Sequence, residues 1–222
     1  MLARWRFERA LAKLTEFPDA TLADYASADW PDPAIAAIQA PLLALDFELD
    51  GLTRDAHLLQ AGWLPFAGRT ISLEGASSHD IRSHADLDRE AVTVHGIGSE
   101  RASVGSRPRE VITNLIKCLS GRVMVAHAAG IERSALQRVS QSLFGVSLPI
   151  RSICTLEIER KLAPNLIGRG VYRLGACRAR YGLPEYAAHN ALTDALAAAE
   201  LFQAQLSRMA HAPSLGSLER YN

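Results

Sequence analysis

The first clear strand signal along the chain is a mostly apolar segment that begins at residue 42. Residues 42–48 (LLALDFE) are apolar except at two acidic positions, and an Asp-Gly pair closes the run with a turn signal. A strand that is apolar on both of its faces is typical of the middle of a sheet that helices cover on both sides. The pattern therefore predicts a central, buried strand.

Strand and helix signals continue along the chain. An Ala-Gly pair separates two strand-like segments, at 57–66 and 69–75, and so predicts a hairpin. Two more apolar segments of strand length lie at 121–127 and 148–154. Helical spacing predicts helices at 2–16, 107–119, 131–143, 155–163, 171–181 and 190–209. Three early strands followed by alternating helices and strands indicate a mixed α/β domain.

The two ends of the chain differ in pattern from its middle. Residues 1–40 are interpreted as an N-terminal appendage, in which a helix is followed by an extended arm rich in Asp, Ala and Pro. Residues 41–210 form the main domain, and residues 211–222 form a short C-terminal tail. The appendage is expected to pack on the domain, with partner binding as the alternative. The candidate buried positions of its helix are Leu2, Trp5, Leu11 and Leu14.

Composition excludes several classes of protein. The 222 residues carry no net charge, so a polyanion would have to be bound by a local patch. The three cysteines include no CxxC pair, which argues against a disulfide framework and a zinc knuckle. The first segment, MLARWRFERALAKL, lacks the apolar core of a secretory signal, and no window reaches the ~18 apolar residues of a membrane span. We therefore expect a cytoplasmic protein without a membrane segment.

Two acidic residues stand at the end of the predicted central strand. Asp46 and Glu48 are two positions apart, so both side chains leave the same face of the strand. Two carboxylates on one face repel each other unless a positive charge lies between them. A divalent cation such as Mg²⁺ or Mn²⁺ suits hard oxygen ligands of this kind. The alternative is a solvated strand end without a ligand.

Two further segments carry side chains that suit the same chemistry. In HNALTDA, His189 precedes a predicted helix and Asp194 lies inside it, beside the apolar face. A carboxylate next to a buried seam needs a partner, and a metal would serve. Glu132 falls in the first turn of the helix after strand 121–127. Taken singly, the two acids could instead complement helix dipoles, and His189 could lie at the surface or cap a helix.

These segments together resemble the DEDDh exonucleases, the family that includes the proofreading subunit of a bacterial DNA polymerase. The family's first motif is matched by DFELDG, its second loosely by VAHAAGIE, and its third by HNALTDA. The segment VHGIG at 94–98 is similar to a further family loop. The order and spacing of the motifs agree from about residue 42 to residue 207.

The resemblance implies a ribonuclease H-like fold, with a five-stranded mixed sheet and helices on both faces. It implies that four carboxylates, on Asp46, Glu48, Glu132 and Asp194, hold two Mg²⁺ or Mn²⁺ ions. It also implies that His189 is the general base for the attacking water. The expected reaction is 3′–5′ exonucleolytic hydrolysis that releases nucleoside 5′-monophosphates.

The resemblance also indicates the substrate and the residues that contact it. Phe47, Leu49, Leu52 and His95 occupy the positions expected to contact the terminal nucleotide, although Phe47 and Leu52 could equally pack in the core. The expected partners are single-stranded DNA or RNA 3′ ends or short oligonucleotides, and the family fold is often a homodimer. Residues 151–180 hold seven basic residues against two acidic ones, so this segment could contact phosphates or could form solvated helix faces.

Three departures from the family pattern bear on activity. Glu132 replaces an aspartate, and its longer side chain must fold back or shift the metal. Leu49 and Asp50 replace a pair of threonines, and Ala128 replaces an asparagine. The alternatives are therefore a binding module with a degenerate site and little turnover, and a phosphodiesterase for short oligonucleotides.

Overall fold

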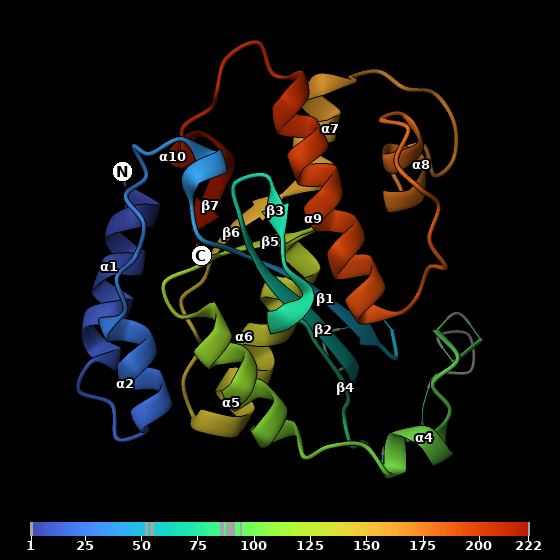
Figure 1. Cartoon of the computed structure of the whole chain (residues 1–222). Coiled ribbons are helices and arrows are strands. Elements are labelled where there is room, and N and C mark those ends of the chain that lie inside the picture. The colour runs from blue at the N-terminus through green and yellow to red at the C-terminus, as the bar shows by residue number, and fades with distance from the viewer. Residues whose placement is uncertain are drawn as a thin grey trace.

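A mixed sheet organises the fold, with strand order β3-β2-β1-β5-β6-β7 and with β4 paired to β2 (Figure 1). The computed structural model describes residues 2–51, 53, 56–84, 87, 92–93 and 95–221. Its strands are β1 (Leu42–Leu49), β2 (Leu58–Ala67), β3 (Thr70–Ile71), β4 (Ser77–Asp80), β5 (Val123–Ala126), β6 (Arg151–Cys154) and β7 (Glu219–Tyr221). β1 pairs antiparallel with β2 and parallel with β5. The mixed α/β class is confirmed, but the sheet has seven strands, so the expected number of five is wrong.

The two strands that the sequence pattern did not predict are short and polar. β4 has the sequence SSHD and is formed by antiparallel pairing with β2. β7 has the sequence ERY, pairs antiparallel with β6, and is anchored by a buried ion pair of 2.7 Å between Glu219 and Arg151. Pairing with a neighbouring strand, rather than hydrophobic periodicity, creates both of them.

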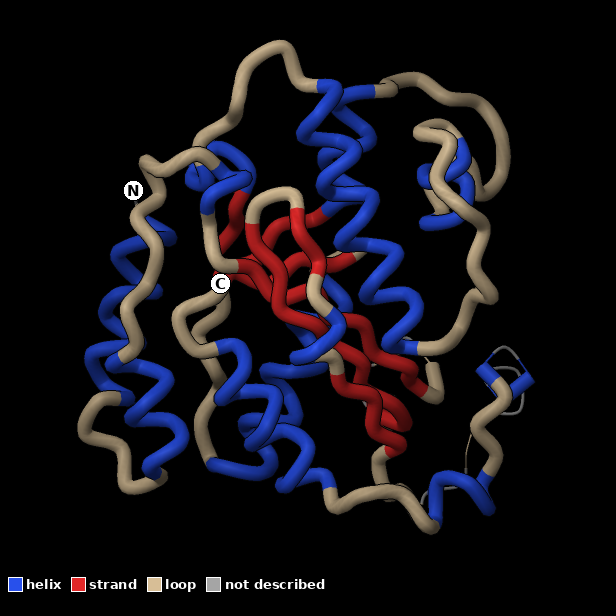
Figure 2. The backbone as a smooth tube through the Cα atoms, viewed as in Figure 1, coloured by secondary structure: helices blue, strands red, loops and turns tan. Residues whose placement is uncertain are grey.

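Helices cover both faces of the sheet, as expected (Figure 2). The α-helices are α1 (Leu2–Leu14), α2 (Ala20–Ser27), α4 (Ser99–Ser103), α5 (Pro108–Leu119), α6 (Gly130–Phe144), α7 (Thr155–Leu162), α8 (Leu174–Ala179), α9 (Ala191–Arg208) and α10 (Leu215–Leu218). The described residues also form 3₁₀ turns at η1 (Ala37–Gln39) and η2 (Leu73–Gly75). In the described part of the chain, none of these helices has the length and apolar character that crossing a membrane requires.

Alternation along β1 divides the core into two layers. Leu43, Leu45 and Phe47 pack into the cluster that also contains buried side chains of α1, α2, α5 and α6. Leu42 and Ala44 pack into the cluster that contains the apolar face of α9. Since successive side chains of a strand point to opposite faces, α9 covers one face of the sheet and α5 and α6 cover the other.

The N-terminal region is more helical than expected. Residues 20–27 form α2, which Asp19 caps by accepting the N–H of Thr21, so the prediction of an extended arm is wrong here. In α1 the buried positions are Phe7, Leu11 and Leu14, whereas Leu2 is 61% exposed and Trp5 is 53% exposed. The expectation that Leu2 and Trp5 are buried is therefore also wrong. The proposed division at residues 40 and 210 stays a prediction.

Candidate active site

β1 ends with two acidic side chains on the face that α9 covers. Asp46 and Glu48 share the face of Leu42 and Ala44, whose side chains pack with α9. Phe47 points to the opposite face and is buried in the other core layer. The strand thus directs the carboxylates of its first motif toward the helix that carries the third motif.

The start of α9 holds the third-motif residues in a defined arrangement. Asn190 is the N-cap residue, and its side-chain oxygen accepts the backbone N–H of Thr193 at 3.1 Å. His189, one residue earlier, has a φ of 67°, a left-handed conformation that is uncommon for a residue with a Cβ. Its backbone N–H donates to Oδ2 of Asp194 at 2.9 Å, which fixes the chain in this conformation. The imidazole is left exposed to solvent.

Three predicted site residues converge between β1 and α9. One ligand atom from each of Glu48, His189 and Asp194 lies within 4.8 Å of the other two. Glu48 is buried, Asp194 is half-buried and His189 is exposed, so the cluster has an open side. Two carboxylates and an imidazole at this separation could hold a metal ion.

Burial and mutual repulsion make the carboxylates of this region difficult to ionise. Burial, followed by the charge of Asp194, raises the pKa of Glu48 to about 7. Burial is also the largest cause that raises the pKa of Glu132 to about 8. The pKa of Asp46 is raised well above its usual value by burial and then by repulsion from Glu132, Glu48 and Asp194. Burial likewise raises the pKa of Asp194, although its bond with His189 opposes that effect.

The donor set fits a divalent cation. Oε1 of Glu48 and Oε2 of Glu132 are buried and have no hydrogen-bond partner. A buried carboxylate oxygen without a partner is costly, and a bound cation would remove that cost. The repulsion that Asp46 receives from the other three carboxylates indicates that all four lie around one place. Glu132 thus lies close enough to Asp46 and Glu48 to interact with both, while its role as the second-motif acid stays a prediction.

The residues expected at the substrate have different environments. Phe47 is 6% exposed and lies in the core, which favours the core-packing interpretation of this residue. Leu49 is partly buried against the same core layer, and Leu52 lies outside the described residues. His95 is buried, and its Nδ1 accepts the N–H of Ile97 at 3.1 Å. Burial, followed by the charge of His189, lowers the pKa of His95, so the two histidines are close enough to interact.

Two departures from the family pattern have a structural account. The carboxylate of Asp50 accepts the backbone N–H of His57 at 2.6 Å, so it links the residue after β1 to the residue before β2. Ala128 has a φ of 67°, a conformation that asparagine and glycine adopt more readily than alanine. The expected asparagine would therefore suit the backbone at that position.

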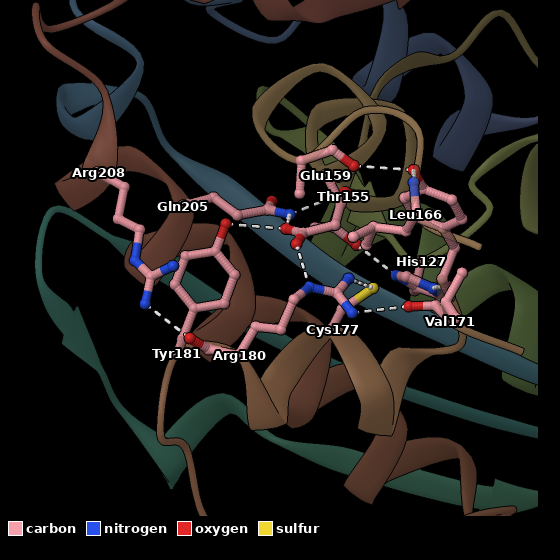
Figure 3. A network of polar contacts seen from close by, with 12 residues as sticks. His127, Thr155, Glu159, Leu166, Val171, Cys177, Arg180, Tyr181, Gln205 and Arg208 are labelled. Atoms are coloured by element: carbon pink, nitrogen blue, oxygen red, sulfur yellow. Dashed lines mark hydrogen bonds and ion pairs between the residues drawn. The ribbon is translucent and has the colours of Figure 1, made fainter. Parts of the chain in front are cut away.

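The basic segment is only partly available to a ligand. Arg151 is paired with Glu219, and Arg178 is paired with Glu200 at 2.8 Å. Figure 3 shows that Arg180 reaches the buried Glu159, at 2.9 Å. Three of the seven basic side chains thus have structural ion pairs. The four exposed ones are Arg160, Lys161, Arg169 and Arg173.

Sequence reasoning did not single out the two residues of β2 that contact the start of α9. The side-chain Oε1 of Gln60 accepts the backbone N–H of Ala191 at 2.9 Å. A Cβ added at Gly62 would lie only 2.1 Å from the backbone nitrogen of Leu192. A glycine inside a strand can mark the close approach of another backbone, and this signal was present in the sequence. An amide in a strand carries no comparable signal.

Comparisons with known proteins identify the family and the fold. Residues 43–202 match the model of the exonuclease family RNase_T. No curated protein matches the sequence significantly. Exonuclease X, solved with 5′-overhanging duplex DNA, is similar with a TM-score of 0.63 and 21% identity, over 79% of this chain and 98% of that one.

Exonuclease I has a similar fold over a shorter share of its length. The zinc-bound E. coli enzyme with single-stranded DNA has a TM-score of 0.65 and 13% identity. The enzyme from Methylocaldum szegediense has a TM-score of 0.63 and 18% identity. Each match covers 77% of this chain but 41% of the exonuclease I chain, so this protein spans less than half of those relatives.

The expected ribonuclease H-like architecture and the expected enzyme class are both confirmed by these matches. The family model spans all three sequence motifs, from the strand with Asp46 to the helix with Asp194. The chain belongs to the RNase_T exonuclease family, of the DEDDh type, and is a hydrolase of nucleic acids.

Proposed function

We propose that this protein is a divalent-metal-dependent 3′–5′ exonuclease with its active site at the junction of β1, α6 and α9. The observation that carries the proposal is the convergence of Glu48, His189 and Asp194 within 4.8 Å. Glu48 comes from the first family motif and His189 and Asp194 from the third, and Asp46 and Glu132 interact electrostatically with the same cluster. A carboxylate cluster whose pKa values are raised by burial and repulsion is typical of a functional site.

Each side chain has a part in the proposed hydrolysis. Asp46, Glu48, Glu132 and Asp194 would hold two Mg²⁺ or Mn²⁺ ions. These cations supply the charge neutralisation and water activation on which this type of phosphodiester hydrolysis depends. The exposed imidazole of His189 accepts a proton from water as the water oxygen bonds to phosphorus. The bond from phosphorus to the 3′ oxygen of the preceding nucleotide breaks, that oxygen takes a proton from solvent, and a nucleoside 5′-monophosphate leaves.

The backbone conformation of His189 supports its role as the base. Because its backbone N–H is bonded to Asp194, the backbone of His189 is held next to that carboxylate. The side chain of His189 is exposed, so water and the 3′ end of a nucleic-acid strand can reach the imidazole. His189→Ala should lower kcat by about 100-fold or more, the usual contribution of a general base, while Mn²⁺ binding is retained. Loss of Mn²⁺ binding in this variant would count against the base role.

A nucleic-acid strand with a 3′ end is the proposed substrate. The similar exonucleases X and I were solved with overhanging duplex DNA and with single-stranded DNA, which supports a DNA strand as the first candidate. The exposed cations Arg160 and Lys161 lie in the last turn of α7, and the exposed Arg169 lies between α7 and α8; all three could contact backbone phosphates. RNA and short oligonucleotides are the alternative substrates. A homodimer and a cytoplasmic location stay predictions.

The proposal is tested with a single-stranded oligonucleotide of about 20 nucleotides that carries a fluorophore at its 5′ end. With Mn²⁺ or Mg²⁺ we expect a ladder of products that shorten from the 3′ end, and no products with a chelator. A DNA strand, an RNA strand and a dinucleotide are compared by kcat/KM. Absence of shortening on all three at high enzyme concentration, with either metal, would overturn the proposal. Binding without shortening would instead indicate a degenerate binding module.

A further inference from the structure

The strand beside β1 supplies no carboxylate to the cluster, but two of its residues lie directly next to the acids. In the antiparallel register of β1 and β2, Asp46 is opposite Gly62 and Glu48 is opposite Gln60. Residues that are directly opposite in a sheet point to the same face. Gln60 and Gly62 therefore face α9, on the side of the sheet where the carboxylates converge.

Gly62 allows the backbone of α9 to lie directly on β2. A Cβ at this position would be 2.1 Å from the backbone nitrogen of Leu192 and 2.2 Å from the carbonyl carbon of Ala191. Both atoms belong to the backbone, so a side chain here would displace the first turn of the helix. That turn follows His189 and contains Asp194, and any displacement would move both.

Gln60 holds the same turn by a hydrogen bond. Its Oε1 accepts the N–H of Ala191, the first residue of α9, at 2.9 Å. The first N–H groups of a helix have no partner within the helix, and Ala191 is fully buried, so solvent does not replace this bond. Two side chains therefore cap the start of α9. Asn190, the residue before the helix, accepts the N–H of Thr193, and Gln60, on β2, accepts the N–H of Ala191.

The orientation of the Gln60 amide is set by a second residue. Its Nε2 donates to Oδ1 of Asp80, on β4, at 2.8 Å. An ionised carboxylate only accepts hydrogen bonds, so the amide nitrogen must face Asp80 and the amide oxygen must face Ala191. Two hydrogen bonds of 2.7 Å from Arg101, on α4, stabilise the charge of Asp80.

We propose that Gln60 is a positioning residue for the reaction, oriented by Asp80 and Arg101, and that it fixes the first turn of α9 so that His189 and Asp194 meet the carboxylates of β1. This inference rests on the proposed exonuclease function. It adds a chain of contacts, from α4 through β4 and β2 to α9, that joins the site to the segment after His95. Gln60 is assigned a role through its contacts with Ala191 and Asp80, and not one in the chemical step itself.

The test compares Gln60→Leu with a matched control, Gln203→Leu. Gln203 also joins α9 to the β2–β3 hairpin by one side-chain bond, to the carbonyl of Gly68 at 3.2 Å, but it lies at the other end of the helix. Gln60→Leu should lower kcat by about 10- to 100-fold with KM changed less than about threefold, because small misplacements of reacting groups cost this much. Gln203→Leu should leave both constants within about twofold. Equal kcat losses in the two variants would overturn the proposal.

Two more measurements keep the proposal testable if Gln60→Leu folds poorly or if the exonuclease assay fails. Amide hydrogen exchange at Ala191 should be slow in the wild type and at least about tenfold faster in Gln60→Leu and in Asp80→Asn. Asp80→Asn should lower kcat less than Gln60→Leu, because the new amide no longer dictates the orientation of Gln60. Exchange at Ala191 that neither variant changes would sink the positioning role, whether or not the wild type degrades oligonucleotides. Wild-type inactivity with the exchange pattern intact would count against the proposed function alone.

Discussion

A cluster built around buried carboxylates lies near each end of α9, and the two clusters have opposite electrostatics. Near the C-terminal end, Glu159 accepts hydrogen bonds from Arg180, Tyr181 and Gln205, at 2.8 to 2.9 Å (Figure 3). These bonds lower the pKa of Glu159 despite its burial. Near the N-terminal end, burial and repulsion raise the pKa of Asp46 and of its acidic neighbours.

The two clusters differ in whether the fold itself supplies hydrogen-bond partners to the buried carboxylates. Glu159 has an arginine, a phenol and an amide as partners within the chain, so its charge is stabilised by the fold. Oε1 of Glu48 and Oε2 of Glu132 are buried without a partner. The protein thus tolerates an electrostatic cost at one end of α9 that it avoids at the other. The proposed divalent cation would remove that cost.

The largest expected effect is the loss of activity in Asp46→Asn. The amide removes one ligand charge and cannot replace it, so hydrolysis should fall by about 1,000-fold or more, which corresponds to about 4 kcal/mol. The metal-free variant should be at least as stable as the wild type, because one source of repulsion is gone. The rate is measured with the 5′-labelled oligonucleotide and the stability by urea unfolding. An unchanged rate would indicate a misplaced site or a contaminating nuclease.

The converse effect is expected for Glu159→Ala. Removal of this buried carboxylate leaves Arg180, Tyr181 and Gln205 without their shared acceptor, and unfolding should become easier by about 3 kcal/mol. The rate per folded molecule should stay within about threefold of the wild type. Urea unfolding and the oligonucleotide assay on the same samples measure both quantities. A kcat loss as large as that of Asp46→Asn, without loss of stability, would erase the distinction between the two clusters.

A smaller effect is expected for Glu132→Asp, which restores the residue type of the family motif. The shorter carboxylate should place the ligand oxygen where the second motif normally has it, and kcat should rise by about tenfold. Single-turnover rates at saturating Mn²⁺ measure the change. A fall in kcat would show that the surrounding residues have adapted to the longer side chain of Glu132.

The smallest effect concerns the pH dependence of metal-free stability. In the folded protein, the pKa of Glu48 is raised to about 7 and that of Glu132 to about 8. Above pH 8 both carboxylates are ionised, and their charges destabilise the folded state most. The penalty is relieved as pH falls and the folded protein takes up protons. The Tm without metal should therefore rise between pH 8.5 and pH 7, by about 2–4 °C for each kcal/mol recovered.

Burial also raises the pKa of Asp46 well above its usual value and that of the Cys177 thiol to about 11, and both groups act in the same direction as Glu48 and Glu132. The lowered pKa values of His95 and His127 affect stability only below about pH 6.5, and that of Glu159 only in stronger acid. Saturating Mn²⁺ should abolish the rise in Tm, because the cation replaces the protons. A metal-free Tm that falls from pH 8.5 to pH 7 would contradict the raised pKa values at the site.

The elements that follow from local pattern were predictable. The apolar run of residues 42–48 became β1, and the expected helix at 190–209 became α9 (Ala191–Arg208). β4 and β7 were not predictable, because SSHD and ERY have no hydrophobic alternation and are strands only through their neighbours. α2 was missed although Asp19 caps it and its buried residues Leu22, Tyr25 and Ala26 have helical spacing.

The candidate site divides in the same way. Asp46, Glu48, Glu132, His189 and Asp194 could be chosen from the sequence because their spacing matches known motifs. The contacts of Gln60 with Ala191 and Asp80 join segments far apart in the chain, so they needed the structure. The structure was also needed to show which basic side chains of residues 151–180 are buried in ion pairs and which are exposed.

The most direct test of the central claim is a calorimetric titration of the chelator-treated protein with Mn²⁺ at pH 7.5, in parallel with Asp46→Asn and Glu159→Gln. If the N-terminal carboxylate cluster of α9 is a metal site, the wild type and Glu159→Gln should show saturable binding, and Asp46→Asn should bind at least about tenfold more weakly. Wild-type binding that is absent, or that Asp46→Asn leaves unchanged, would contradict the account.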